Sequence, residues 1–383
     1  MKMSSVLIAR GFVPQNFESA ARAVAAGLAC GLVSLAFGLS FAALIFGGSL
    51  APWLAYGIAA SFIASAVAAL VVALGSTLPF SIAGPDGSTS AVTAALVMSL
   101  TQHLAATGAN DRLLVATLLV MPISSALTGL LLCGIGFAGG GRAVRFVPYP
   151  VIGGFLGATG LLIVLGALRV VLDQYISFAD LSALTLPTSA LKLSAAIAVA
   201  AALLISSWRT PNPAVMPGIL IAATALAYVV KSSTGTSFGG ASAQGWMFNI
   251  TTRNVLDLPW GADELNLFPW QHLPLLAGDL IAVTFVTAVS TLLNLTGIEY
   301  ATHREADLNT ELKTLGIANL CSAAFGGYAS CIFLSRTLLN FHMGATTRLS
   351  GILVAVICGL VLVLDPALLS FVPKFVLGGC SST

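Results

Sequence analysis

The sequence predicts an all-α polytopic membrane protein, and its composition and two long uncharged runs carry this prediction. Only 8% of the residues are charged and 57% are hydrophobic, whereas a soluble domain carries about 25% charged residues. No charged residue occurs between Ala23 and Pro85, a stretch long enough for two helical crossings of about 20 residues each. A second uncharged run extends from Leu113 to Gly141. A transmembrane β-barrel would show short alternating segments instead.

We interpret about twelve apolar segments as membrane spans. The longest connection, 231–274, carries Trp246, Trp260 and Trp270, which fit an interfacial aromatic belt. The most charged stretch, 299–313, predicts an amphipathic helix on the membrane surface. The expected spans cover residues 24–46, 52–74, 87–103, 113–137, 150–171, 190–207, 214–230, 275–297, 313–328, 332–343, 349–365 and 369–380.

The distribution of Lys and Arg indicates the orientation. If the N-terminus is cytoplasmic and the spans alternate, ten basic residues fall on the cytoplasmic side and five on the other. We therefore expect a multi-pass protein of the inner (plasma) membrane with its N-terminus in the cytoplasm. The net charge of +2 identifies no partner, and with this composition we expect the lipid bilayer, and no nucleic acid.

One nine-residue phrase occurs twice. FVPYPVIGG at 146–154 and FVPKFVLGG at 371–379 share six of nine residues. The first copy opens the fifth expected span and the second opens the twelfth. Because seven spans separate them, the two copies start from opposite sides of the membrane, which is typical of an inverted repeat in secondary transporters. The alternative is a chance recurrence of Pro and Gly in apolar sequence.

An inverted repeat divides the chain into two unequal parts. The first repeat covers 1–230 with spans one to seven, and 231–274 is an extracellular or periplasmic loop. The second repeat, 275–383, holds spans eight to twelve and is incomplete. We expect the native chain to continue past Thr383 into two further spans.

In such transporters the substrate site lies where broken helices meet near the midplane. Two interrupted segments stand seven spans apart: SIAGPDGSTSAVTAAL, 81–96, opens span three, and FGGYASCIFLSRTLLNF, 325–341, opens span ten. Pro85 cannot donate a backbone hydrogen bond, and Gly84 and Gly87 permit unusual dihedral angles.

Helix starts are expected in both segments. Ser88, Thr89 and Ser90 suit a helix N-cap, and a second short helix starts near Phe333. If the two helix N-termini face each other, their positive dipole ends create one anion site.

Arg336 sharpens this hypothesis because burying an arginine in the membrane centre costs at least about 2.5 kcal/mol. It either attracts an anionic substrate, with Ser335 donating a hydrogen bond, or it forms a structural ion pair or extends to the membrane surface. Asp86 is the ion-pair candidate, and it is also a candidate cap of span three or a carrier of a proton or substrate role. These alternatives stay open.

The segment DLNTELKTLGIANLCSAAFGG, 307–327, followed by LSRTLLNFHMGATTRLSG, 334–351, resembles the SulP (sulfate permease) family of anion transporters. SIAGPDGSTSAV and YPVIGGFLGATG resemble its bacterial members. The resemblance implies a 7+7 fold of two inverted seven-span repeats. Spans one to four and eight to eleven then form a mobile core, and the others form a gate that makes a homodimer. It also implies a C-terminal STAS domain, and no part of this sequence corresponds to one.

The resemblance implies that Ser335 and Arg336 line the anion site. Its P-Q-x-x-A-(F/Y)-A phrase in span one corresponds to AFGLSFA, 36–42, so Phe41 keeps the aromatic residue and Phe37 replaces the glutamine. Phe37 and Phe41 are therefore candidate anion-binding residues, although core packing explains the four-residue spacing of the two rings equally well.

Many bacterial members carry a glutamate in span eight, where this chain has Ser290 within AVSTLL. A hydroxyl cannot carry that charge, so cation symport through this position is in doubt. Exchange, uniport, or coupling through Asp86, Asp279 or Glu299 stay open, although placement at helix ends explains the last two residues.

These observations favour a secondary transporter of small anions by elevator-type alternating access. Sulfate, bicarbonate, chloride, nitrate and dicarboxylates are all compatible. An anion channel on the same scaffold is the alternative, and a nucleobase carrier is less favoured because it needs acidic residues where Ser290 and Arg336 stand. We expect no enzyme, cofactor or metal site, since the four histidines are dispersed and the six cysteines form no CxxC pair.

Overall fold

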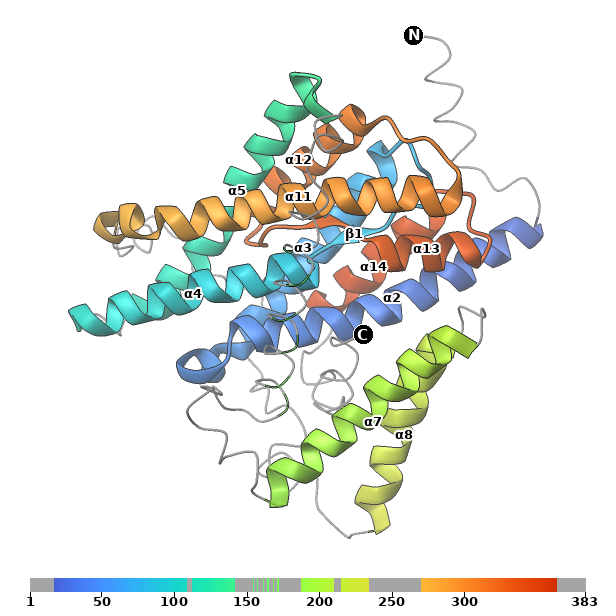
Figure 1. The fold of residues 1–383 in the computed structure, drawn as a ribbon, viewed down its shortest axis with the longest axis horizontal. Helices are drawn as coiled ribbons and strands as arrows, with labels where there is room; N and C mark the ends of the chain where they lie inside the picture. The colour runs from blue at the N-terminus through green and yellow to red at the C-terminus, as the bar shows by residue number, and fades with distance from the viewer. Residues whose placement is uncertain are drawn as a thin grey trace.

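The computed structural model describes residues 17–108, 112–141, 187–209, 215–233 and 270–363, with single helical positions between 154 and 171. Figure 1 shows a helical bundle in which two very short strands lie near the centre. The elements are α2 (Phe17–Ile45), η1 (Gly48–Trp53), α3 (Leu54–Gly75), β1 (Ala83–Gly84), α4 (Gly87–Thr107), α5 (Leu113–Phe137), α7 (Pro187–Arg209), α8 (Val215–Ser233), η5 (Trp270–Leu276), α11 (Ala277–Thr302), α12 (Leu308–Ala324), β2 (Cys331–Ile332), α13 (Leu334–His342) and α14 (Leu349–Val363).

Helices occupy every expected span that falls on described residues. Four segments are long and apolar enough to cross a membrane, namely Phe17–Ile45, Gly48–Gly75, Leu113–Phe137 and Leu273–Thr302. The repeated phrase, the expected fifth and twelfth spans, Trp246 and Trp260 lie outside the described residues or reach them only at isolated positions. The inverted relation of the two copies therefore stays a prediction.

The amphipathic surface helix expected over 299–313 is wrong. Helix α11 extends through the first part of this stretch and ends where His303 adopts a left-handed conformation with φ 52°. A turn follows, and Asp307 then begins α12 as its N-cap by accepting hydrogen bonds from the amides of Asn309 and Thr310. Many of the charges belong to a turn and a helix cap instead of to one polar helix face.

The expectation of a polar surface helix fails most clearly at Glu311, in the first turn of α12, because this side chain is 0% exposed. Its Oε1 accepts hydrogen bonds from the hydroxyl of Ser76 at 2.9 Å and from the amide of Thr77 at 2.6 Å. The side chain ties the start of α12 to the end of α3, a contact that sequence periodicity does not reveal.

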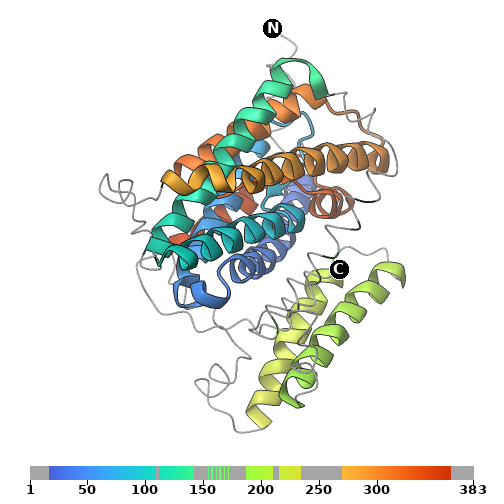
Figure 2. The same ribbon diagram turned by 60° about the vertical axis from the view of Figure 1, so that its left-hand side comes forward.

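The helices of the two halves pack against each other and form one core. Helix α5 packs on α12, α14 packs on α2 and α3, and α11 packs on α4 and α5. Figures 1 and 2 show α7 and α8 as a separate pair beside this bundle. A Cβ atom added at Gly129 of α5 would lie 2.8 Å from the carbonyl oxygen of Gly316 in α12. Small residues therefore allow these two backbones their close approach.

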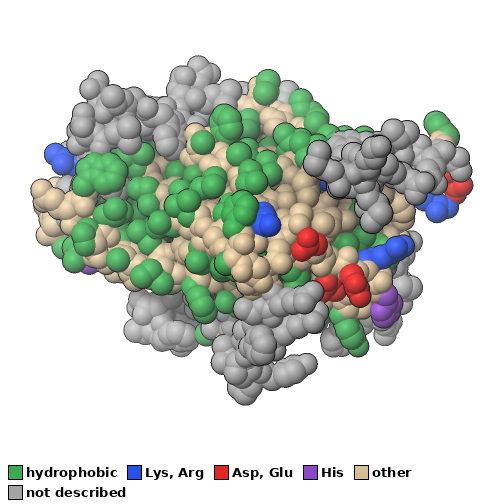
Figure 3. All heavy atoms as spheres, turned by 90° about the horizontal axis from the view of Figure 1, so that it is seen from above, with side chains coloured by type: hydrophobic (Ala, Val, Ile, Leu, Met, Phe, Trp, Pro, Cys, Tyr) green, Lys and Arg blue, Asp and Glu red, His purple; other side chains and the backbone are tan. Residues whose placement is uncertain are grey.

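The surface is apolar over large areas, as a lipid-facing surface requires. On the face in Figure 3, hydrophobic side chains cover one half and acidic and basic side chains gather toward the other end. Large side chains of α11, such as Ile281 at 68% and Phe285 at 62%, are exposed. Such exposure fits lipid, because a soluble monomer rarely exposes contiguous apolar patches of this kind.

The two interrupted segments meet in the middle of the bundle, where β1 pairs with β2 in antiparallel fashion, Ala83 opposite Ile332 and Gly84 opposite Cys331. The amide of Phe333 donates to Ile82 O at 3.0 Å, and the side-chain amide of Asn294 donates to Ile332 O at 2.8 Å. Non-helical backbone is tolerated at membrane depth only where protein satisfies it in this way. Because the strands are antiparallel, α4 and α13 begin at opposite ends of this short ladder and run away from it in opposite directions (Figure 1).

Candidate anion site

Helix α4 begins with a closed capping box. Asp86 is the N-cap, its carboxylate accepts from the first-turn backbone, and its own amide donates to Thr89 Oγ1 at 3.0 Å. The expected N-cap at Ser88, Thr89 or Ser90 is therefore wrong, because the helix starts earlier, at Gly87. A carboxylate forms a stronger cap than a hydroxyl here, since it also opposes the positive end of the helix dipole.

The Asp86 carboxylate draws together three other elements. Its Oδ2 lies 3.1 Å from Ser88 Oγ and 3.1 Å from Ser290 Oγ of α11, and these two hydroxyls are 3.1 Å apart. The Cys331 thiol of β2 lies 3.5 Å from the same oxygen. Ser290 of α11 thus contacts the carboxylate that caps α4.

Helix α13 begins differently, with Phe333 as its N-cap and no side-chain cap. Arg336 in its first turn is only 5% exposed. Its Cζ lies 3.2 Å from the ring centroid of Phe333 and 4.9 Å from that of Phe37. Both rings therefore contribute cation–π attraction.

The guanidinium of Arg336 is only partly hydrogen-bonded. Its Nη1 donates to Ser34 Oγ at 3.1 Å, but its buried Nε has no hydrogen-bond partner in the described part of the chain. Snorkelling to the membrane surface is excluded by this burial. Arg336 and Asp86 attract each other electrostatically without a direct ion pair between them. A buried cation with an unused donor is equipped to bind an anion.

The other predicted residues have mixed placements. Phe41 is 4% exposed and stacks on Phe37 with ring centroids 5.6 Å apart, so it supports the ring that faces Arg336. Ser335 is exposed beside Arg336. The Ser90 hydroxyl instead lies 3.3 Å from Tyr328 Oη. The structure thus brings Phe37 to Arg336, leaves Ser335 exposed as the sequence neighbour of this buried arginine, and leaves Ser90 in a packing role.

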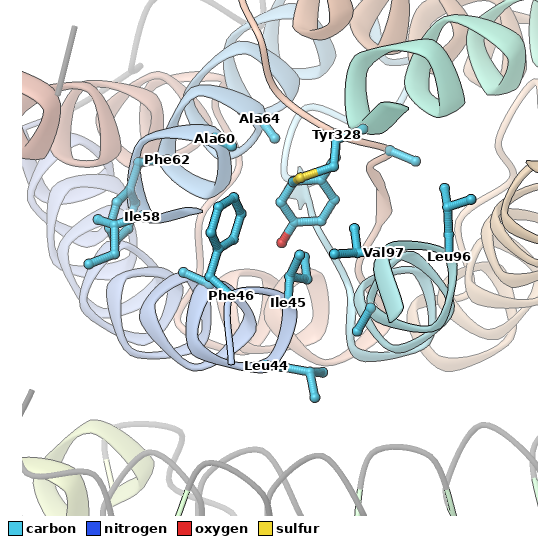
Figure 4. Close-up of a cluster of buried hydrophobic side chains, with 14 of the residues drawn as sticks. Leu44, Ile45, Phe46, Ile58, Ala60, Phe62, Ala64, Leu96, Val97 and Tyr328 are labelled. Carbon is cyan, nitrogen blue, oxygen red and sulfur yellow. The ribbon is translucent and has the colours of Figure 1, made fainter. Parts of the chain in front are cut away.

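Sequence reasoning missed Ser34, Phe333 and Tyr328. Ser34 lies one helical turn before Phe37, so the i, i+3 spacing could have placed both on one face. Tyr328 is fully buried among Ile45, Phe46 and Val97 (Figure 4). Its hydroxyl lies 3.3 Å from those of Ser61 and Ser90, which joins α3 to the first turn of α4.

A hollow of about 880 Å³ lies elsewhere, at the turn between α11 and α12, and includes Glu299, His303 and Asp307 but none of the predicted anion-site residues. The Thr310 hydroxyl donates to Asp307 at 2.7 Å and lowers the pKa of that carboxyl.

No group of three or more His, Cys, Asp or Glu side chains suited to a metal ion occurs among the described residues.

The fold and the site define an all-α polytopic membrane protein in which two interrupted segments meet beside a buried arginine. The sequence profile of the sulfate permease family matches residues 21–380. The chain therefore belongs to the sulfate permease family.

Three curated relatives are similar to parts of this chain. The chain is 23% identical over 293 residues to the vacuolar basic amino acid transporter VSB1 of Saccharomyces cerevisiae, covering 73% of this chain and 28% of the relative. It is 26% identical over 229 residues to the putative sulfate transporter YbaR of Bacillus subtilis, covering 60% and 42%. It is 26% identical over 318 residues to the bicarbonate transporter BicA of Synechocystis, covering 80% and 52%.

Solved structures share the fold. The transmembrane domain of a cyanobacterial bicarbonate transporter BicA matches with a TM-score of 0.70 at 21% identity, covering 96% of this chain and 88% of that chain. SLC26A9 matches with a TM-score of 0.70 at 18% identity, covering 94% and 56%. The chain spans about half or less of the length of the curated relatives it matches.

Proposed function

We propose that this chain is the membrane domain of a secondary transporter for small anions, with the substrate held at the N-terminus of α13. The observation that carries the proposal is Arg336, a guanidinium that is 5% exposed and has an unpartnered Nε. The rings of Phe37 and Phe333 make cation–π contacts with the guanidinium, and Ser34 Oγ accepts a hydrogen bond from Nη1. Ser335, the residue before Arg336 in the chain, is exposed. The names of two relatives, sulfate and bicarbonate transporters, support this substrate class.

The proposed movement is elevator-type alternating access. Helices α2–α5 and α11–α14 pack as one core with the candidate site inside it, so the site can move only with the core. In this proposal residues 1–230 and 275–383 are inverted repeats joined by the loop 231–274. The core slides against a gate that makes a homodimer in the inner membrane, with the N-terminus in the cytoplasm.

The test is counterflow of labelled anions into proteoliposomes. Sulfate, hydrogencarbonate, chloride, nitrate and a dicarboxylate are compared for the parent protein and for Arg336→Ala. We expect saturable counterflow of at least one anion in the parent and its loss in the variant. Arg22→Ala is the matched control, because Arg22 is exposed and pairs with Glu18. Undiminished counterflow by a well-folded Arg336→Ala protein would contradict the site.

A further inference from the structure

The ladder of β1 and β2 has only two strands in the described part of the chain, yet the outer edge of β2 is hydrogen-bonded. Successive residues of a strand direct their backbone groups to alternate sides. The Phe333 amide points toward β1, where it donates to Ile82 O at 3.0 Å. The same alternation turns the backbone groups of Ser330 and Ile332 away from β1. Unpaired groups on that side would be costly, because no water reaches them at membrane depth.

Asn319 of α12 supplies the partners of Ser330. Its Oδ1 accepts from the Ser330 amide at 2.8 Å, and its Nδ2 donates to Ser330 O at 3.0 Å. One side-chain amide therefore pairs with both backbone groups of one residue, as a neighbouring strand would. Asn294 of α11 continues this edge by donating to Ile332 O at 2.8 Å. Two asparagine side chains thus take the place of a third strand.

The amide of Asn319 is held in one orientation. It is fully buried, and its Nδ2 also donates to Leu315 O of the same helix at 3.0 Å. The hydroxyl of Ser125 in α5 lies 3.0 Å from Asn319 O and 3.3 Å from Oδ1. A flipped amide would place its NH2 group against the Ser330 N–H and its oxygen against two carbonyl oxygens. The packed pair of α5 and α12 therefore fixes the amide and, through it, Ser330.

We propose that Asn319 is a positioning residue of the candidate anion site, because it fixes the register of β2. Phe333 and Arg336 follow Ser330 in the same short segment, and the Phe333 ring contacts the guanidinium. A strand that slips by one residue turns every side chain to the opposite face. The position of β2 therefore determines where α13 begins and where these two side chains lie. This inference rests on the proposed function.

The test uses Asn319→Leu, which keeps a side chain of similar size and removes both hydrogen bonds to Ser330. In counterflow of labelled sulfate and hydrogencarbonate into proteoliposomes, we expect the half-saturating anion concentration to rise about tenfold. Thr314→Val is the matched control, since Thr314 is also buried in α12 and donates to Gly75 O of α3, outside the ladder, at 3.2 Å. This control should lower the melting temperature and leave the half-saturating concentration unchanged.

A second measurement follows β2 without any anion. Cys331 of β2 is fully buried, so N-ethylmaleimide should label it slowly in the parent protein and in Thr314→Val. In Asn319→Leu we expect its labelling to be about fivefold faster, because β2 opens locally when its outer edge is unpaired. Mass spectrometry of the peptide that contains Cys331 separates its labelling from that of the other cysteines.

The outcomes separate this inference from the proposed function. Unchanged labelling of Cys331 in a folded Asn319→Leu protein overturns the inference, and so does an unchanged half-saturating concentration. Changes no larger than those of Thr314→Val overturn it as well. Each of these results leaves anion transport standing. If the parent moves none of the anions, the proposed function is wrong, and the labelling of Cys331 decides whether Asn319 fixes β2.

If Asn319→Leu does not fold, Ser125→Ala replaces it in the same two measurements, because it removes the hydroxyl beside Asn319 Oδ1. Its control is Ser124→Ala, an equally buried serine of α5 whose hydroxyl donates to Met121 O of its own helix at 2.6 Å. We expect a rise of about two- to fivefold in Ser125→Ala and none in Ser124→Ala. Equal values for the two variants overturn the inference.

Discussion

The N-termini of α4 and α13 lie at the opposite ends of the ladder formed by β1 and β2, and they differ in electrostatic character. Helix α4 has 21 residues and is closed by the Asp86 carboxylate in a capping box. Helix α13 has nine residues, no side-chain cap, and Arg336 in its first turn. Two broken helices at corresponding places therefore need not contribute equally to an anion site.

This difference locates the positive side of the site. The dipole of α4 is already opposed by its own cap, whereas the first amides of α13 add to the charge of Arg336. In the proposed site the N-terminus of α13 is therefore the positive end, and that of α4 carries the Asp86 carboxylate. The hypothesis that both dipole ends form one anion site stays a prediction. Three substitutions test this contrast, in addition to the change at Arg336.

Gly84→Val is expected to have the largest effect of the three because it disturbs both ends together. A Cβ atom at Gly84 would lie 3.0 Å from Cζ of Phe333, the ring that stacks on the guanidinium. Valine therefore pushes this ring away or separates β1 from β2. Overpacking of this kind costs about 1–3 kcal/mol, and we expect anion uptake to fall by about tenfold to hundredfold.

The control for this change is Gly359→Val in α14, where no described atom lies within 4 Å of the added Cβ. Uptake and melting temperature are measured for both variants. Normal uptake by Gly359→Val with a large loss in Gly84→Val supports the close approach. Equal, small effects would show that the meeting of the two strands does not position the site.

Ser34→Ala is expected to have an intermediate effect that is confined to the α13 end. It removes the hydroxyl that accepts from Arg336 Nη1 at 3.1 Å. Hydrogen bonds to charged groups contribute about 1.5–3 kcal/mol, so the half-saturating anion concentration should rise about tenfold. Ser40→Ala is the control, because Ser40 is also buried in α2 but no contact with Arg336 is observed. If both variants keep the parental value, Ser34 does not position the guanidinium.

Thr89→Val is expected to have the smallest effect on transport, since it acts on the end that is already capped. It removes the hydroxyl that accepts from the Asp86 amide and leaves the side-chain shape nearly unchanged. Loss of a cap costs about 1 kcal/mol, so the melting temperature should fall by a few degrees. Anion affinity should change less than twofold. Thr89→Ser keeps the hydroxyl and should restore stability, and an affinity loss that serine does not restore would count against a purely capping role.

Much of the helical framework was predictable because membrane spans are encoded locally. The span expected over 113–137 coincides with α5, and the short helix expected near Phe333 begins at Leu334. Asp86 as a cap was one of the open alternatives, and the structure shows it in that role. Interrupted segments with Gly, Pro and short polar side chains carry enough information to predict where helices break.

The site itself was predicted only in part, since its residues come from distant segments. Arg336 was recognisable because a charge in an apolar helix is costly. Its partners Ser34 and Phe333, and the contact of Asp86 with Ser290, depend on how α2, α11 and β2 pack. The prediction of a surface helix over the polar stretch that contains Glu311 also failed because burial depends on tertiary packing. A charged residue in the sequence does not indicate which side of a helix will be buried.

Composition and the spacing of apolar runs by themselves determined that the chain is a helical membrane protein and which helices are broken, because hydrophobic length and backbone hydrogen bonding act within each segment. Only the tertiary structure decided which broken helix keeps a positive end. The antiparallel pairing of Ala83 with Ile332 places one capped and one uncapped N-terminus at the two ends of the same short ladder. Burial then makes the unused donor of Arg336 far more influential than it would be in water.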